Sequence, residues 1–225
     1  MKNRTPLAQR SLPNYSRGEE IMNMVSHILG GVLGLAALIL CRLGATDSWE
    51  KTGAWIYGVS MIALYTLSSI YHGLRPGMGK RVLQVLDHCT IYILIAGTYT
   101  PILLAAFRPV YPWICWGLFA AQWGLAALAI TLTAIDLKKY NVFSMSCYIL
   151  LGWGIVFFIP QTIRVMTLPG FHLLLWGGIA YTVGAVLYGI GSKRPWFHSV
   201  FHVFVFFGSF LQFLAIYLYV FSPDL

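Results

Sequence analysis

The sequence predicts an all-α fold: a polytopic membrane protein with seven transmembrane helices in one bundle. Three observations lead to this prediction. Of 225 residues, 58% are apolar and only 10% are charged, whereas a soluble domain has about 45–50% apolar and about 25% charged residues. Seven stretches free of charged residues follow one another along the chain. Each is a continuous apolar run rather than an alternating one, which argues against a transmembrane β-barrel.

The seven stretches lack Asp, Glu, Lys and Arg over about 20 residues or more, enough for a helix to cross ~30 Å of hydrocarbon. A helix satisfies its own backbone hydrogen bonds in lipid, which an open sheet or loop cannot do. In chain order, the expected helices span approximately residues 21–41, 53–73, 83–107, 111–134, 141–161, 172–190 and 196–221. We expect residues 1–20 to form a cytoplasmic tail and residues 21–223 to form a single transmembrane domain.

The cationic residues between these stretches predict the orientation, because loops rich in Lys and Arg stay in the cytoplasm. The tail and every second loop after it hold eleven of the 15 cations: Lys2, Arg4, Arg10, Arg17, Arg75, Lys80, Arg81, Lys138, Lys139, Lys193 and Arg194. The other loops hold four: Arg42, Lys51, Arg108 and Arg164. We therefore expect a cytoplasmic N-terminus and an extracytoplasmic C-terminus, in the plasma membrane and specifically a bacterial inner membrane.

The formal net charge of +8 does not indicate a nucleic-acid partner. The cations are spread between apolar runs instead of clustering on one face, as a nucleic-acid surface requires. The expected partners are the lipid bilayer and a membrane lipid that serves as substrate or ligand. The sequence indicates no particular protein partner.

Histidine and serine residues mark the cytoplasmic ends of the second and seventh expected helices. His198 and His202 are four residues apart, so both rings leave one face of a helix about a turn apart, as ligands of a single metal ion do. Ser68 and His72 have the same spacing on the second helix. Ionisable groups cost roughly 2.5–3.5 kcal/mol at the centre of a membrane helix and less near its ends, so they are functional candidates.

Two further helices bring polar side chains to the same depth. Glu20, Asn23 and His27 form a single stripe on the first helix, and Asp87 lies near the start of the third. At 1.5 Å per residue, all of these side chains lie within about 5–15 Å of the cytoplasmic boundary. We expect the stripe on the first helix to surround the metal ligands and orient them.

The donor types predict which metal is bound. Three imidazoles with no thiolate and one nearby carboxylate suit one Zn²⁺ held by three His and a water, the arrangement of catalytic zinc. A structural zinc site is more often closed by four protein ligands. Haem is disfavoured because His198 and His202 lie on the same side of their helix, whereas bis-His haem needs ligands on opposite faces. Copper and nickel remain as alternatives.

Five motifs in this order resemble the hemolysin III branch of the progestin and adipoQ receptor (PAQR) family, over nearly the whole chain. They are Glu20-x-x-Asn23-x-x-x-His27, Ser68-x-x-x-His72, Asp87, the block LDHCTIYILIAGTYTP from Leu86 to Pro101, and His198-x-x-x-His202. The resemblance implies seven helices with the N-terminus inside. It also implies that His72, His198 and His202 hold zinc, that Asp87 contacts the zinc-bound water, and that Ser68 lies beside it.

Three functions occur on the scaffold that the chain resembles, so the fold alone does not choose among them. We favour the first function, zinc-dependent hydrolysis of a lipid amide or related bond. Alkaline ceramidases, which resemble this residue pattern, hydrolyse a lipid amide. Asp87 would be the base, and Ser68 would donate to the oxyanion or orient Asp87. The alternative is a non-enzymatic, receptor-like regulator of membrane lipid or ion homeostasis. The second alternative is a pore-forming cytolysin, disfavoured because the ionisable residues stop at the inner side.

Overall fold

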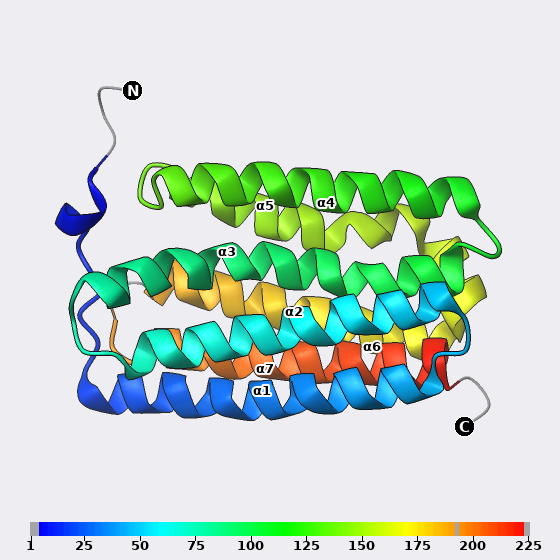
Figure 1. Ribbon diagram of the computed structural model, residues 1–225, viewed down its shortest axis with the longest axis horizontal. Coiled ribbons are helices and arrows are strands. Elements are labelled where there is room, and N and C mark those ends of the chain that lie inside the picture. The colour runs from blue at the N-terminus through cyan, green and yellow to red at the C-terminus, as the bar shows by residue number, and fades with distance from the viewer. Residues whose placement is uncertain (1–4, 192–193, 223–225) are drawn as a thin grey trace.

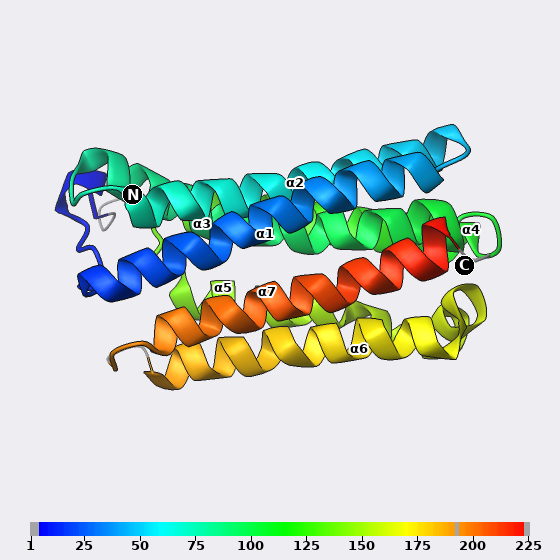
Figure 2. The ribbon, with the colours of Figure 1, turned by 90° about the horizontal axis from the view of Figure 1, so that it is seen from below.

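The protein is an elongated bundle of helices that lie along one axis (Figures 1 and 2). The computed structural model describes residues 5–191 and 194–222. Three parts of the sequence-based prediction lie outside the described residues. They are residues 1–4 of the expected tail, Lys193, and residue 223 at the end of the expected domain. Every regular element in the described ranges is helical. The first described residues lie at one end of the bundle and the last at the other (Figure 1).

Along residues 5–191 and 194–222, seven α-helices and four short helical segments follow one another. The α-helices are α1 (Arg17–Gly44), α2 (Ser48–Gly73), α3 (Met78–Pro101), α4 (Pro112–Ile135), α5 (Asn141–Trp153), α6 (Ile159–Gly191) and α7 (Phe197–Ile216). The short segments are the 3-10 helices η1 (Leu7–Gln9) and η3 (Gly154–Phe158) and the π-helices η2 (Ile102–Phe107) and η4 (Tyr217–Phe221). We call the end where α1 begins and α2 finishes the N-terminal end.

Capping residues start α1 and α2 several residues before their apolar stretches. Ser16 accepts a hydrogen bond from the Glu19 backbone N–H, and the Glu19 side chain accepts one from Ser16 N–H. Asp47 and Glu50 form the same capping box at α2. The boxes satisfy N–H groups that a helix start otherwise leaves unpaired. Helix α1 therefore includes residues 17–20, which the charge-free windows assign to the N-terminal tail.

The stretch after α4 differs from the expected helices 141–161 and 172–190. Helical structure runs from Asn141 to Gly191, narrows to a 3-10 helix at η3, and breaks at Thr167, where φ is 62°. Pro169 follows the break, and the chain turns back along the bundle there (Figure 1). The break lies between the two expected helices, but helical structure extends further into residues 162–171 than the charge-free windows predict. A positive φ is unusual for a β-branched residue such as threonine.

The chain has six helical stretches that are long and apolar enough to cross a membrane within its described part, and the fifth is Asn141–Gly191. Large apolar side chains face outward along the bundle, among them Trp113, Phe157 and Val142, which are 78–87% exposed. A soluble protein rarely exposes so continuous an apolar surface. The chain is thus an all-helical, multi-pass membrane protein that contacts the lipid bilayer.

The helices pack unevenly. The pairs α1–α2, α2–α3 and α6–α7 make the most extensive contacts, and α7 also packs against α1. A Cβ on Gly30 of α1 would lie 2.2 Å from the Tyr65 ring of α2, so only glycine lets these helices approach. Helix α5 makes far fewer contacts with α6. The well-packed group holds α2 and α7 close to α1, which positions the candidate site.

Candidate metal centre

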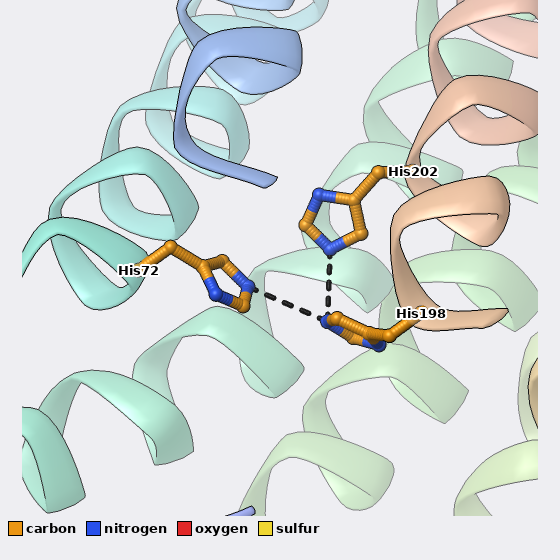
Figure 3. A group of neighbouring side chains, drawn as sticks. All are labelled: His72, His198 and His202. Atoms are coloured by element: carbon orange, nitrogen blue, oxygen red, sulfur yellow. Dashed lines mark hydrogen bonds between the residues drawn. The ribbon is translucent and has the colours of Figure 1, made fainter. Parts of the chain in front are cut away.

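Three histidines from α2 and α7 point toward one another at the N-terminal end of the bundle (Figure 3). The Nε2 atom of His198 lies 3.4 Å from Nε2 of His72 and 3.0 Å from Nε2 of His202. One nitrogen from each ring lies within 4.8 Å of the other two. His72 and His202 are 2% exposed, and His198 is half-buried. The structure brings these predicted ligands together.

The separations suit a metal ion. Zinc bound to imidazole nitrogens at about 2.0–2.1 Å in a tetrahedron places those nitrogens about 3.3 Å apart. The separations of 3.0 and 3.4 Å in the histidine cluster lie on either side of that value. Helix geometry supplies two of the three ligands, because residues four apart project from one face. The histidine cluster can therefore hold a metal ion.

Glu20 lies behind His72 and contacts its ring. Its Oε2 atom is 2.6 Å from His72 Nδ1, so Nδ1 is the protonated nitrogen that donates to the carboxylate. That tautomer leaves a lone pair on Nε2, which faces the other two rings. The Asn23 amide lies 3.5 Å from the same Nδ1 atom. Both residues therefore lie where the stripe on the first helix was expected.

His27 supports the cluster by packing. Its ring stacks on His202 with a centroid separation of 3.8 Å and an interplanar angle of 19°. It is 4% exposed, and neither ring nitrogen has a hydrogen-bond partner among the described residues. Its contact with His202 restricts how that ring can turn. His27 therefore lies behind a ligand rather than among the ligands.

Ser68 and Asp87 line the cavity that reaches the histidine cluster. This cavity holds about 1690 Å³ of space, counting its open mouth, and runs between α3, α5, α6 and α7. Its walls are mainly apolar, and His198 and His202 lie at one end with Ser68 and Asp87. The Ser68 hydroxyl is buried without a protein partner in the described ranges. Asp87 is 3.8 Å from His88 Nδ1, and its expected contact with a metal-bound water stays a prediction.

Two residues of the site are absent from the sequence-based set. Lys80, which the charge count treats as a loop cation, is 3% exposed and donates to Glu20 Oε1 and to the Leu74 carbonyl. It lies in the first turn of α3, where a cation opposes the helix dipole, and the Glu20 carboxylate compensates for this. Tyr15 stacks on His198 with centroids 4.8 Å apart. It lies outside any helix, so no periodicity marks it.

These features define a class: multi-pass membrane proteins with a three-histidine cluster at one end of the helical bundle. A sequence model of the family described as "Haemolysin-III related" matches residues 15–213. The chain therefore belongs to the haemolysin-III related family, the hemolysin III branch of PAQR, which confirms the resemblance drawn from the motifs.

Known relatives match nearly the full length. The chain is 37% identical to "Hemolysin-3" of Bacillus cereus, over 90% of this chain and 92% of the relative. It is 34% identical to "Hemolysin-3 homolog" of Bacillus subtilis (strain 168), over 89% and 94% of the two chains. It is also 28% identical to the human "Monocyte to macrophage differentiation factor", over 99% of this chain and 93% of that protein. The family therefore extends from bacteria to animals.

Proposed function

We propose that this protein is a zinc-dependent hydrolase that cleaves a lipid amide or related bond inside the membrane. The observation that supports this most strongly is the cavity, because apolar walls lead to the histidine cluster, Ser68 and Asp87. An acyl chain suits such walls, since burying it there replaces contact with lipid tails by similar apolar contacts. The polar end then receives the amide. The three-histidine cluster supplies the metal site.

The residues present suit the chemistry of amide hydrolysis. A zinc ion held by the three histidines supplies Lewis-acid activation of a carbonyl and lowers the pKa of a water molecule. Asp87 accepts the proton of the attacking water, and the Ser68 hydroxyl donates to the oxygen that gains negative charge. The C–N bond then breaks. The amine leaves with the proton that Asp87 accepted, so one water is consumed and a fatty acid and an amine form.

The orientation is part of the proposal. The stretch Asn141–Gly191 has 51 residues, or about 76 Å of straight helix at 1.5 Å per residue, far longer than a ~30 Å hydrocarbon core. Its reversal at Thr167 supports two crossings, and so seven in all. With the charge bias, the N-terminal end and the histidine cluster face the cytoplasm. A reporter fused after Leu225 would then be extracytoplasmic, and one in the Lys138–Lys139 turn cytoplasmic; both on one side would contradict this orientation.

The hydrolase proposal is tested with purified protein in nanodiscs. Zinc content is measured first, and then fatty-acid release from ceramide-type and other N-acyl lipids. We expect the unmodified protein to bind one zinc per chain and to release fatty acid. His72→Ala should abolish fatty-acid release, and Asp87→Asn should retain zinc but release no fatty acid. His172→Ala is the matched control, because His172 is exposed and lies outside the cavity. Zinc at full stoichiometry in a triple His72, His198 and His202 to Ala variant would contradict the site.

A receptor-like regulator is the second candidate. The histidine cluster joins α2 to α7, so a metal there would clamp two helices whose packing a bound lipid or ion changes. Lipid binding that raises the unfolding temperature of zinc-loaded protein, without any release of fatty acid, would favour this function over hydrolysis.

The third candidate is a pore-forming cytolysin, which we consider because the two Bacillus relatives are named hemolysins. The position of the buried ionisable residues argues against a pore, because those described lie toward the N-terminal end. Leaving aside cysteine thiols and tyrosine hydroxyls, they are Arg10, Glu19, His27, His72, Lys80, Asp136 and His202. A pore lined by charged side chains would have them through the full depth of the bundle. Conductance of planar bilayers containing purified protein, retained in the three-histidine variant, would support a pore.

A further inference from the structure

The segment before α1 crosses the N-terminal end of the bundle. We call residues 5–16 the strap. Its start is held by Thr5, whose backbone N–H donates to Asp136 Oδ2 at 3.1 Å. Its middle is held at Arg10, whose Nη2 atom donates to the Ile135 carbonyl at 2.7 Å and whose own carbonyl accepts from Arg81 Nε at 2.9 Å. The strap thus runs from the α4–α5 turn past α3 to the start of α1 (Figure 1).

Tyr15, near the end of the strap, lies over two of the three candidate ligands. Its ring is stacked on His198, with centroids 4.8 Å apart and planes 14° from parallel. It also lies 5.8 Å from His72, ring centre to ring centre, at 48°. Stacked aromatic pairs at such separations are worth about 0.5–1.5 kcal/mol beyond their buried area. Tyr15 therefore favours one orientation of the His198 ring.

Hydrogen bonds hold the backbone close to both rings of the Tyr15–His198 pair. Ser16 directly follows Tyr15 and caps α1 through Glu19. The Glu19 side chain also accepts a 2.6 Å hydrogen bond from the Trp196 backbone N–H, two residues before His198. One carboxylate therefore joins the residue after Tyr15 to the start of α7. The stacking is held by the framework and does not depend on a mobile loop.

We propose that Tyr15 is a positioning residue of the metal centre: it holds the His198 ring with Nε2 toward His72 and His202, while the strap covers the metal from the N-terminal end. This inference rests on the metal binding in the proposed function, but not on hydrolysis. A metal ion bound there would leave toward the N-terminal end only when the ring turns or the strap lifts. The strap would therefore slow metal exchange.

The test measures zinc transfer from protein in nanodiscs to a water-soluble chromophoric chelator. We expect Tyr15→Ala to bind one zinc and to release it about three- to tenfold faster than the unmodified protein, the range that a lost stack allows. Tyr15→Phe keeps the stacked ring and is expected to release zinc at the original rate. Arg10→Ala loosens the strap while keeping Tyr15 and is expected to give an intermediate rate.

Tyr140→Ala is the matched control, because Tyr140 lies in the α4–α5 turn and contacts, among the aromatic residues described, only Phe143, edge to face. Its release rate should not change. Co²⁺ in place of zinc gives a second readout, since its visible spectrum changes when a ligand is displaced. We expect Tyr15→Ala, but not Tyr15→Phe, to alter that spectrum. A general loss of stability would not change the zinc release rate or the Co²⁺ spectrum selectively in Tyr15→Ala.

The possible results separate this inference from the proposed function. Zinc bound by every variant with equal release rates and equal Co²⁺ spectra would overturn the role of Tyr15 and leave the metal centre intact. An unmodified protein that binds no zinc or cobalt would overturn both. If Tyr15→Ala does not fold, Tyr15→Leu retains apolar volume without a ring and is expected to give the same faster release.

Discussion

The two ends of the bundle each pair a carboxylate with a cation, and the two pairs differ in burial. At the N-terminal end, Lys80 Nζ contacts Glu20 Oε1, and their side chains are 4% and 21% exposed. At the far end, Arg108 Nη2 lies 2.8 Å from Asp47 Oδ2, and those side chains are 25% and 47% exposed. The contact geometry is similar. The two carboxylates differ in the groups that they contact through their other hydrogen bonds.

Glu20 is linked to His72 and so to the candidate metal centre, whereas Asp47 caps its own helix. An exposed pair contributes about 0–1 kcal/mol, because water screens both charges. Losing one partner of a buried pair costs about 3–5 kcal/mol, because a charge remains desolvated. The comparison teaches that burial and connection, rather than the distance between two atoms, decide what an ion pair does in this protein.

The largest expected effect comes from Lys80→Met. We expect the free energy of unfolding to fall by about 3 kcal/mol, the lower limit for buried pairs, because Glu20 keeps some exposure. Zinc affinity should fall about 10–100-fold, since Glu20 would no longer be held against His72. The measurements are SDS-induced unfolding in micelles and zinc competition. Arg108→Met is the matched control, and equal losses in the two variants would break the comparison.

A second variant sharpens the first. Glu20→Gln combined with Lys80→Met removes both charges, so we expect it to regain part of the stability that Lys80→Met loses. It should not regain zinc affinity, because a glutamine does not hold the His72 tautomer as a carboxylate does. Recovery of both properties would mean that Glu20 serves only to neutralise Lys80.

Metal removal gives the next largest effect. With free zinc at 100 times its dissociation constant, binding contributes about 2.7 kcal/mol to stability. Removing zinc with a chelator should therefore lower the unfolding free energy by about that amount. His202→Ala should make the protein insensitive to the chelator, whereas His172→Ala should respond like the unmodified protein. A His202→Ala variant that still responds would place the metal elsewhere.

The far end is expected to show a smaller effect that does not depend on metal. Asp47→Ala removes the side chain that caps α2, so the unfolding free energy should fall by about 1 kcal/mol. Zinc affinity should not change, because the cap lies at the opposite end of α2 from His72. SDS unfolding and zinc competition again provide the measurement. A change in zinc affinity here would show that the two ends are coupled through α2.

The smallest effect concerns pH. The Glu50 backbone N–H, more than Arg108, holds the pKa of the Asp47 carboxyl below its ordinary value. A lowered pKa stabilises the folded state above the unfolded value of about 3.9, and that contribution is lost as pH falls through the lower, folded pKa. Asp47→Asn keeps the cap, so we expect it to be only a few tenths of a kcal/mol less stable at pH 6. That difference should shrink as pH falls below about 4 and vanish below the lower, folded pKa.

Sequence reasoning predicted the helical membrane fold because apolar runs this long have few other solutions. It predicted the ligand group because His198 and His202 are four residues apart and His72 ends a neighbouring helix. It predicted a break between residues 161 and 172, and Thr167 lies in that interval. It did not predict that helical structure extends through most of the interval, since the charge at Arg164 ends a charge-free window without ending a helix.

Lys80 and Tyr15 show the other limit of sequence reasoning. A lysine between two apolar stretches is indistinguishable from a loop cation until the loop is seen to be short and the lysine to lie inside the next helix. Tyr15 reaches His198 across 183 positions of sequence, through the strap's path over the bundle. Contacts of this kind depend on how distant segments meet, which local periodicity does not encode.

The origin of the ligands on α2 and α7 has a consequence for synthesis on the ribosome. Glu20, His72 and Lys80 all lie within the first 80 residues, so this half of the site is complete once α3 begins. His198 follows His72 by 126 residues, or roughly 6–25 s at about 5–20 residues per second. During that interval the buried Glu20–Lys80 pair holds a single imidazole in place. Helix α7 supplies the other two histidines, so an intact three-histidine cluster reports that the chain has been made and inserted at least as far as His202.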